Sequence, residues 1–394
     1  MNLIFLLTGL LFVLGIAYLF SNGRKKIRIR PAATMIAIQL ILAFVLLNTE
    51  AGIGIVSYLS LMFNKLLEMA DTGIDFVFGG LENEGAFTFY LHVLLPIIFI
   101  SILIGIFNYF KILPFVIKHV GRALSKINGM GRLENYIAVS TAVLGQPEVY
   151  LTVKKQLRLV SEKRLYTFCT SGMSAVSMAI VGSYMKMLEP KYVVIGVVLN
   201  ILSALIVASI INPYEVKDEE DLLLLEDGEA KPAFFEMVGD SIMDGFKIAC
   251  VVAAMLVGYV ALMSLLNYAF TGAFHISFQT ALGYVFAPIA FLMGVPMHET
   301  VHAGSIMATK IVTNEFVAMQ GFQSLAASLS PKTIGILSVY LVSFANFGTI
   351  GTLIGGIKAL DEKQGNQAAR FGLKLLLGST LASVISATVA GTFL

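Results

Sequence analysis

Charged residues are scarce in this sequence. Asp, Glu, Lys and Arg make up 13% of its 394 residues, well below the share of about 25% in ordinary soluble domains. Hydrophobic residues make up 57%, so the chain has too little polar surface to cover itself in water. The net charge of +2 is too small to point to nucleic acid. The composition therefore predicts an integral membrane protein.

Cysteine is also scarce. Cys169 and Cys250 are the two cysteines, and each lies in an apolar run. We interpret them as buried free thiols, which excludes a disulfide framework. The first apolar run, residues 2–21, lacks a basic start and is followed by basic residues. It therefore predicts a true membrane span and not a cleaved signal peptide.

Long apolar runs, by contrast, are plentiful. A helix needs about 20 apolar residues to cross about 30 Å of hydrocarbon. We expect eight crossings, at residues 2–21, 33–49, 89–109, 165–187, 192–211, 245–268, 333–357 and 371–392.

Two further segments are not expected to cross. Residues 53–80 are mixed and amphipathic, which predicts an interfacial helix. The acidic residues 212–232 predict a solvated cytoplasmic loop.

Lysine and arginine are unevenly distributed. They cluster at residues 23–30, 111–132 and 154–164, and they are absent from 248–309. Because basic loops stay on the cytoplasmic side, the clusters are predicted to lie inside. With eight crossings, both termini are then predicted to lie outside.

Two stretches fit neither spans nor loops. Residues 130–160 are apolar, are interrupted by "GQPE" (145–148), and have basic residues on both sides. This pattern predicts a re-entrant hairpin that enters from the cytoplasm and returns. Residues 280–328 are predicted to form a second hairpin that enters from the opposite face.

Each hairpin is followed by two spans, and the first span of each pair is rich in Gly and Ser, at residues 171–184 and 343–352. The fold class expected is thus an all-α polytopic membrane protein with an inverted repeat, two broken helices and two opposed hairpins. Secondary transporters are built in this way, with the site at the midplane.

The same pattern divides the chain into four parts. Two would belong to a scaffold: residues 1–110, and residues 212–272 with the acidic loop and the sixth span. The other two would be transport repeats, at residues 111–211 and 273–394.

Two carboxylates lie at the predicted hairpin tips, Glu148 and Glu315. An ionisable group at the bilayer centre costs roughly 2.5–3.5 kcal/mol, so it usually faces a cavity and functions there. Gln146 and Asn314 beside them add amides, which indicates a neutral polar solute with many hydrogen-bonding groups. The break of the seventh span would contribute further groups: Asn346, Thr349 and the apolar side chain of Phe344.

The stretch "TKIVTNEFVAM" (309–319), preceded by "GVPMHETVHAGSIM" (294–307), resembles the signature of the concentrative nucleoside transporters. "GQPE" and "SFANFGTIG" resemble the family's first hairpin tip and its broken seventh span. The sequence departs from the family at Ala308, where Gly is common, and at Pro147, where Ser or Thr is usual.

The resemblance implies a homotrimer in the cell membrane, with a static scaffold and a transport domain that moves as an elevator. It implies no cofactor beyond the coupling ion. Loss of the hydroxyl at Pro147 favours a pocket that tolerates purines. By motif, Gln146 and Glu148 would contact the nucleobase, Glu315, Asn346 and Thr349 would bind the ribose, and Phe344 and Ile180 would line the base pocket.

The coupling ion follows from two positions. In sodium-driven relatives an Asn and a hydroxyl help to hold the cation, and here Thr141 and Ala175 stand in their places. Since a hard cation needs several oxygen ligands, we expect proton symport, with Glu148 or Glu315 as the carrier. Sodium held mainly by backbone carbonyls is the alternative.

Residues 298–302 also match the zinc-protease pattern His-Glu-x-x-His. A catalytic zinc needs a third protein ligand, and no span offers an Asp near the right place. We therefore expect no enzyme here and take His298 and His302 as ordinary polar residues. A sensor or channel of the same fold is a further alternative, which the inverted repeat disfavours.

Overall fold

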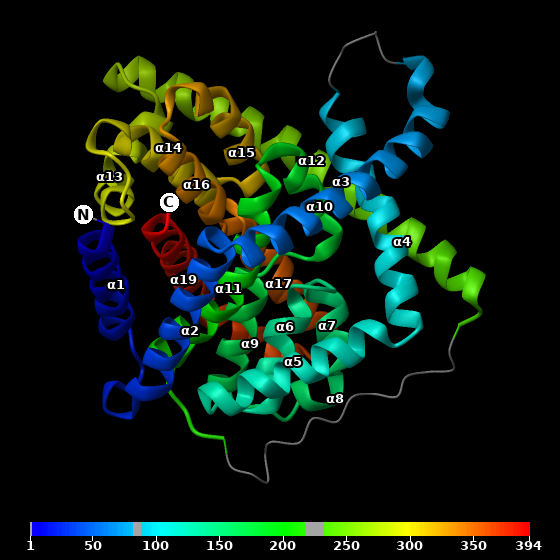
Figure 1. Ribbon diagram of the computed structural model, residues 1–394, viewed down its shortest axis with the longest axis horizontal. Coiled ribbons are helices and arrows are strands. Elements are labelled where there is room, and N and C mark those ends of the chain that lie inside the picture. The colour runs from blue at the N-terminus through cyan, green and yellow to red at the C-terminus, as the bar shows by residue number, and fades with distance from the viewer. Residues whose placement is uncertain (1, 82–87, 217–231) are drawn as a thin grey trace.

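The computed structural model describes residues 2–81, 88–216 and 232–394, and these residues form helices with no β-strand among them (Figure 1). The predicted all-α membrane fold is confirmed. Most of the acidic stretch 212–232 lies outside the described residues. The first helices are α1 (Asn2–Leu19), α2 (Ile29–Asn48), α3 (Glu50–Phe78), α4 (Pro96–Tyr109) and α5 (Ile112–Asn128).

The middle of the chain holds the first hairpin and the spans after it. Its helices are α6 (Arg132–Thr141), α7 (Gln146–Thr152), α8 (Lys154–Leu157), α9 (Glu162–Ser174), α10 (Met178–Met187) and α11 (Pro190–Ile211). The remaining helices are α12 (Phe234–Phe274), α13 (Phe278–Leu292), α14 (Thr300–Val312), α15 (Glu315–Leu325), α16 (Pro331–Leu341), α17 (Phe347–Leu360), α18 (Glu362–Arg370) and α19 (Gly372–Thr392).

Within the described residues, eight helical segments are long and apolar enough to cross a membrane. Seven of them overlap predicted spans. The eighth is 50–81, where we expected an interfacial helix over 53–80; its helix α3 has 29 residues. The predicted span 333–357 is not continuous, because it is divided between α16 and α17.

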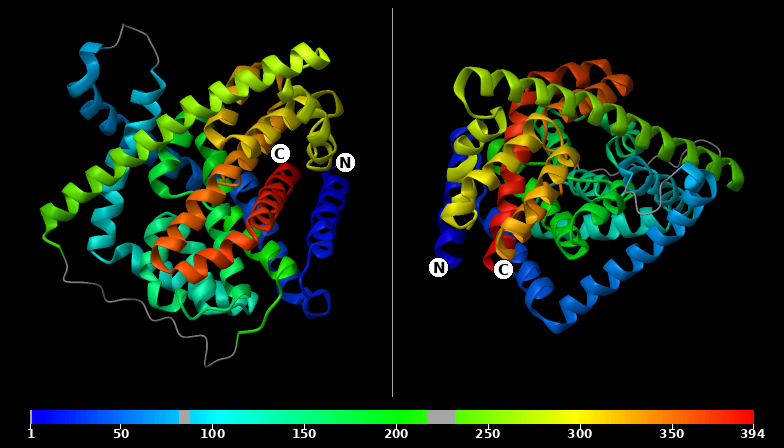
Figure 2. Two further views of the ribbon diagram at one scale, coloured as in Figure 1. Left: turned by 180° about the vertical axis from the view of Figure 1, so that it is seen from behind. Right: turned by 90° about the horizontal axis from the view of Figure 1, so that it is seen from above.

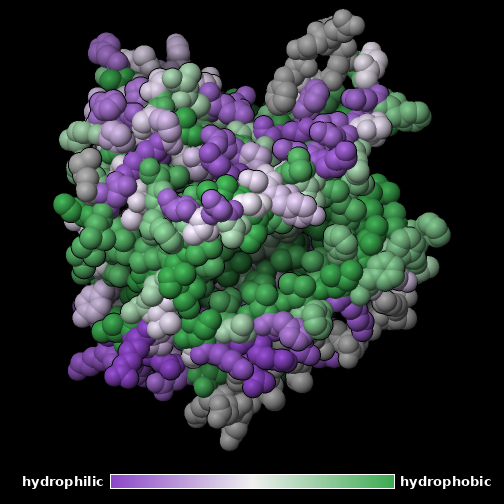
Figure 3. All heavy atoms as spheres, in the orientation of Figure 1, coloured by the Kyte–Doolittle hydropathy of each residue, from purple (hydrophilic) through white to green (hydrophobic). Residues whose placement is uncertain are grey.

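The longest helix, α12, has 41 residues and extends well beyond the predicted span 245–268. It crosses the outside of the molecule and packs along α4 (Figure 2). Few of its side chains are buried by other helices. Figure 3 shows an apolar belt between two hydrophilic ends of the molecule, as expected of a surface that faces lipid.

The centre of the molecule is formed by α9, α10, α11, α16 and α19, whose residues are mostly buried. Small residues on α19, such as Gly378, Ser379 and Ala382, lie inside this bundle. Small side chains let helix backbones approach closely, which is how helices pack in membranes. The two broken helices, α9–α10 and α16–α17, contribute to this buried centre.

A helical hairpin occurs at both predicted places. In the first, α6 and α7 are joined by a turn at 142–145. The second is more complex than the single hairpin expected over 280–328, because it contains three helices. Of these, α14 and α15 form the hairpin, and α13 is an additional helix packed on α14.

The two chain ends lie together. The side-chain amide of Asn2 donates a hydrogen bond of 3.2 Å to the carbonyl of Thr392, and both ends are in the upper part of Figure 1. The opposite end collects basic segments: Lys374 donates to Asn22 at 2.5 Å, and Arg28 donates to the carbonyl of Gly129 at 3.2 Å. One end of the molecule is therefore rich in basic residues, and the termini lie at the other.

Candidate functional site

The tip of the second hairpin places Glu315 at the first position of α15. Its N-cap is Asn314, whose side-chain oxygen accepts a hydrogen bond of 3.0 Å from the backbone N–H of Val317. The N-terminus of a helix favours negative charge, which stabilises the Glu315 carboxylate although only 4% of the residue is exposed. The amide oxygen of Asn314 is thus used for capping, where we expected it to face the solute.

The break of the seventh span lies directly against this carboxylate. Asn346 caps α17, since its side-chain oxygen accepts hydrogen bonds from the N–H of Thr349 at 2.8 Å and from the Thr349 hydroxyl at 3.1 Å. Its amide nitrogen donates to Glu315 at 3.0 Å. The three residues predicted to bind ribose therefore form one buried, hydrogen-bonded cluster.

Lys310 is a member of this site that we did not predict. It is completely buried, and its ammonium donates to the carbonyl of Tyr340 at 2.5 Å and to the hydroxyl of Ser343 at 2.6 Å. These groups belong to the break between α16 and α17, where backbone carbonyls lose their helical partners and need others. The signal was a single cation in the apolar run "MATKIV" (307–312), five residues before Glu315.

Helix α10 brings Tyr184 and Ile180 to the same place. The Tyr184 ring packs edge-on against that of Phe316 with 5.2 Å between centroids, and its hydroxyl lies close enough to Glu315 to interact electrostatically. That hydroxyl is fully buried and faces the Glu315 carboxylate from α10. Ile180 lies one turn earlier on α10 and is buried.

The tip of the first hairpin turns at Gly145, whose φ of +101° is open to glycine and costly for other residues. Helix α7 then begins at Gln146, whose amide donates 2.7 Å to the carbonyl of Gly172 on α9. A Cβ at Gly172 would lie 2.6 Å from the Tyr150 hydroxyl. Glycine at that position therefore allows α7 to approach α9 closely.

Glu148 follows on the first turn of α7. One of its carboxylate oxygens would lie 2.9 Å from a Cβ at Gly145, and Ser177 contacts the same glycine. The side chain is exposed, although protein groups surround it on most sides. Asp244 on α12 is near enough to act on it electrostatically.

Helix α17 connects the two tips. Its side chain Leu353 lies beside Gly172, as does Gln146, and its cap Asn346 contacts Glu315. In Figure 1 and in the reverse view of Figure 2, α6 and α7 lie in the lower half of the molecule and α14 and α15 in the upper half. The half-buried Phe344 belongs to the break beside Asn346.

The two positions predicted to concern the coupling ion lie on the first hairpin and at the break between α9 and α10. Thr141 ends α6, and its hydroxyl donates to the carbonyls of Ile137 and Ala138 at 2.9 and 3.2 Å. Ala175 is extended and separates α9 from α10. The backbone N–H of Met178 donates 3.2 Å to the carbonyl of Val143, which ties the first hairpin to this break.

The residues of the zinc-protease pattern do not form a metal site. His298 and His302 are both exposed and belong to different helical segments. Glu299 is buried and accepts hydrogen bonds from the N–H and hydroxyl of Ser330 at 3.0 and 2.9 Å. Its role is to anchor the start of α16. No group of three metal-binding side chains occurs in the part of the chain that the structure describes.

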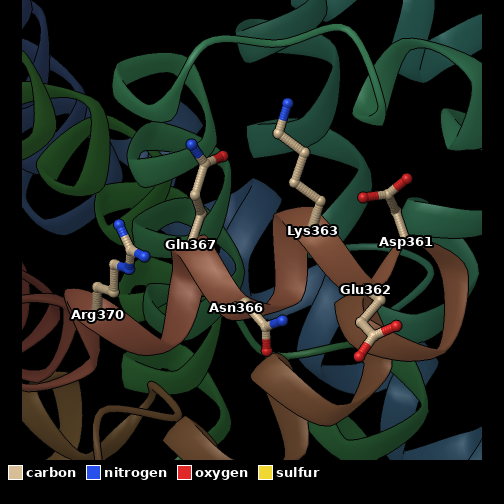
Figure 4. A pocket seen from close by; sticks show the side chains of 6 residues that line it. All are labelled: Asp361, Glu362, Lys363, Asn366, Gln367 and Arg370. Carbon is tan, nitrogen blue, oxygen red and sulfur yellow. The ribbon is translucent and has the colours of Figure 1, made fainter.

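A surface hollow on α18 lies apart from these clusters. Figure 4 shows its side chains spreading away from one another, so they present no common binding point. None of them is a predicted site residue. They are Asp361, Glu362, Lys363, Asn366, Gln367 and Arg370.

Comparison with known proteins agrees with the motifs. Three family profiles match the chain: "Na+ dependent nucleoside transporter N-terminus" at residues 8–81, "Nucleoside recognition" at 90–191, and "Na+ dependent nucleoside transporter C-terminus" at 192–391. The purine nucleoside transport protein NupG of Bacillus subtilis is 35% identical over 98% of both chains. The nucleoside permease NupC of Helicobacter pylori is 29% identical over 99% of this chain and 98% of its own.

Solved structures agree as well. CNTnw in an inward-facing, substrate-bound state matches with a TM-score of 0.93 and 30% identity, covering 100% of this chain and 98% of its own. A variant of CNTnw in an outward-facing state matches with a TM-score of 0.94 and 30% identity, covering 100% and 99%. With this similarity over its whole length, the chain belongs to the concentrative nucleoside transporter family and is an integral membrane transporter of nucleosides, not an enzyme.

Proposed function

We propose that this protein imports nucleosides into the cell across the plasma membrane by proton symport. The observation that carries the proposal is the buried contact between Glu315 and Asn346, which joins a hairpin tip to a broken helix. The second acidic tip, at Glu148, reaches the same pair of broken helices from the other hairpin. Such a site suits a solute that offers hydrogen-bonding groups at two ends.

A nucleoside fits the polarity of the cluster. Its vicinal ribose hydroxyls would both donate to the Glu315 carboxylate, which accepts such bonds strongly because it is charged. Asn346 and Thr349 would complete the ribose site, and Gln146 and Glu148 would contact the base. The apolar side chains of Phe344 and Ile180 would cover the faces of the base ring.

We further propose that both hairpins are re-entrant and that access alternates by an elevator-type movement in a homotrimer. The transport repeats 111–211 and 273–394 would move against a scaffold formed by the rest. Support comes from the opposed placement of the hairpins, and from relatives of the same fold in inward- and outward-facing states.

The basic end of the molecule would face the cytoplasm and the termini would lie outside. Basic segments stay on the cytoplasmic side of membranes, and the contacts of Arg28 and Lys374 gather them at one end. This orientation makes the first hairpin enter from the cytoplasm.

Proton coupling is supported by the chemistry at Thr141 and Ala175. The Thr141 hydroxyl donates hydrogen bonds to carbonyls of its own helix, and Ala175 has no side-chain oxygen, so these two positions offer a cation at most one side-chain oxygen. A sodium ion needs several oxygen ligands and would depend on backbone carbonyls here. Glu148 or Glu315 would then carry the proton. Because Pro147 offers no hydroxyl to the base, the pocket is proposed to accept purine nucleosides.

The test is uptake of labelled uridine, adenosine, inosine and guanosine into proteoliposomes, with pH and sodium gradients imposed separately. We expect accumulation above the external concentration when the pH gradient alone is present. Accumulation driven by sodium at fixed pH, with no response to a pH gradient, would refute the proton assignment. Equilibration without accumulation would indicate a channel.

A further inference from the structure

Helix α5 is held against the first hairpin through one of its faces. Ile117, Gly121 and Asn128 on this face are buried. A Cβ at Gly121 would lie 3.2 Å from the backbone nitrogen of Tyr136 on α6, so glycine lets the two helices approach closely. The amide of Asn128 donates a hydrogen bond of 2.6 Å to the side-chain oxygen of Asn135 on α6. The helix is therefore fixed to the first arm of the hairpin.

The exposed side of α5 carries two rows of different chemistry. Residues three or four apart lie on one side of a helix. The first row is basic and consists of Lys118, Arg122 and Lys126. The second row is apolar and consists of Ile112, Val116, Val120 and Ile127. The side chains of both rows are exposed, and the centres of the rows lie about 120° apart around the helix.

The basic row has no acidic counterpart. Helix α5 contains no Asp or Glu, and the three cations form no ion pair with any of the described residues. Arg28 donates to the carbonyl of Gly129, just past the end of α5, and adds a further positive charge there. A helix with exposed basic and apolar rows is typical of a membrane surface, where the apolar side chains enter the hydrocarbon and the cations stay with the headgroups.

The position of α5 suits such a surface. In Figure 1 the helix lies across the lower half of the molecule, and Figure 3, in the same orientation, shows there the boundary between the apolar belt and a hydrophilic end. Lys and Arg clustered beside the hydrocarbon attract anionic headgroups. A second copy of the chain fits less well, because in the same membrane it would present its own basic end at this depth.

We propose that the basic row of α5 binds the phosphate headgroups of anionic phospholipids, while the apolar row lies in the hydrocarbon of the same leaflet. Because α5 is fixed to α6, the bound lipid lies at the base of the first hairpin. With the orientation proposed above, this is the cytoplasmic leaflet.

The experiment uses the absence of tryptophan from the sequence, since one introduced indole then reports on α5 alone. Val116→Trp places the indole in the apolar row, at an exposed position. The full chain is reconstituted into vesicles of phosphatidylcholine and phosphatidylglycerol, in which one lipid or the other carries brominated acyl chains. Quenching by bromine measures how often each lipid lies beside α5. Both leaflets hold both lipids, so the result does not depend on the orientation of the protein.

Two charge variants are made in this background. The first removes the basic row and carries Lys118→Gln, Arg122→Gln and Lys126→Gln. The matched control removes three exposed cations from α17 and α18 and carries Lys358→Gln, Lys363→Gln and Arg370→Gln. Melting temperature and nucleoside binding check that each protein is folded.

We expect phosphatidylglycerol to be enriched beside α5 about fivefold or more over its share of the vesicle, since one cation near a charged membrane surface contributes about this factor. Added salt should reduce the enrichment by screening. The variant without the basic row should lose the enrichment and still be quenched by both lipids. The control should keep both properties.

Quenching in proportion to the share of each lipid would overturn the proposal, as would enrichment that survives loss of the basic row. Enrichment lost in the control as well would also overturn it, because the overall positive charge would then be responsible. No quenching by either lipid would show that the apolar row is covered by a second copy or faces water. Enrichment lost with inorganic phosphate, and not with chloride at the same ionic strength, would assign the row to a soluble anion instead.

Discussion

The side-chain amide of Asn346 donates a hydrogen bond of 3.0 Å to the carboxylate of Glu315 across 31 residues of sequence. Both residues lie at the N-termini of short helices, α17 and α15, in the buried centre of a membrane protein. The contact joins a hairpin tip to a broken helix. It places a charged acceptor where a neutral solute with hydroxyl groups would be recognised.

The first prediction concerns Glu315. Replacement by Gln is expected to abolish nucleoside uptake, because an amide accepts hydroxyl donors more weakly than a carboxylate. The variant keeps the size of the side chain and is expected to remain folded. Labelled uptake and a thermal melt in detergent measure both effects. Uptake at the unmodified rate would show that the site is assigned wrongly.

A sharper form of this test uses nucleosides that lack a ribose hydroxyl. In the unmodified protein, removal of one hydroxyl is expected to weaken binding by about tenfold. In Glu315→Gln, the complete and the deoxy nucleosides should bind alike, because the two changes remove the same contact and are not additive. Additive losses would place the ribose elsewhere.

The second prediction compares the two cap residues Asn346 and Asn314. Serine is a good N-cap, so replacement of either Asn by Ser should change the melting temperature little. Only Asn346 donates to Glu315, and Asn346→Ser is therefore expected to weaken nucleoside binding by about tenfold. Asn314→Ser serves as the matched control. Equal losses in both variants would contradict a specific role for Asn346.

The third prediction concerns Lys310. Replacement by Met leaves the buried Tyr340 carbonyl and the Glu315 carboxylate without their cation, which should destabilise the protein by about 3 kcal/mol. Lys332→Met is the control. Within the described residues, Lys332 donates a hydrogen bond to the side chain of Asn2, and its replacement should cost less than about 1 kcal/mol. Melting temperatures of the purified proteins test this order. A fully stable Lys310→Met variant would contradict it.

The fourth prediction concerns the zinc-protease pattern. A chelator is expected to leave uptake unchanged, and His298→Ala and His302→Ala should transport normally because both side chains are exposed. Glu299→Ala should lower the stability by about 1–3 kcal/mol, since the Ser330 donors lose their acceptor. Chelator-sensitive proteolysis by the purified protein would refute this account of Glu299.

Much of the architecture follows from apolar length and polar interruptions. The breaks near 175 and 344 and the turns before Gln146 and Glu315 were predicted, because Gly, Ser, Pro, Asn and Glu are unusual at membrane depth. The length of α12 was not. Amphipathic and apolar helices continue past the hydrocarbon boundary when other helices support them, and hydropathy alone does not show where they end.

The finer contacts of the site depend on three-dimensional packing. The sequence marked Lys310 as an unusual cation, but its partner Tyr340 follows 30 residues later. The sequence also gave no sign that the side-chain oxygen of Asn314 caps a helix. An N-cap can be recognised only when the first residue of the helix is known.

The most direct test is a structure determined with a purine nucleoside bound. We predict that its ribose hydroxyls contact Glu315 and Asn346, and that its base lies between Phe344 and the first hairpin tip at Gln146 and Glu148. A nucleoside found anywhere else, or one that contacts a single tip, would contradict the shared site.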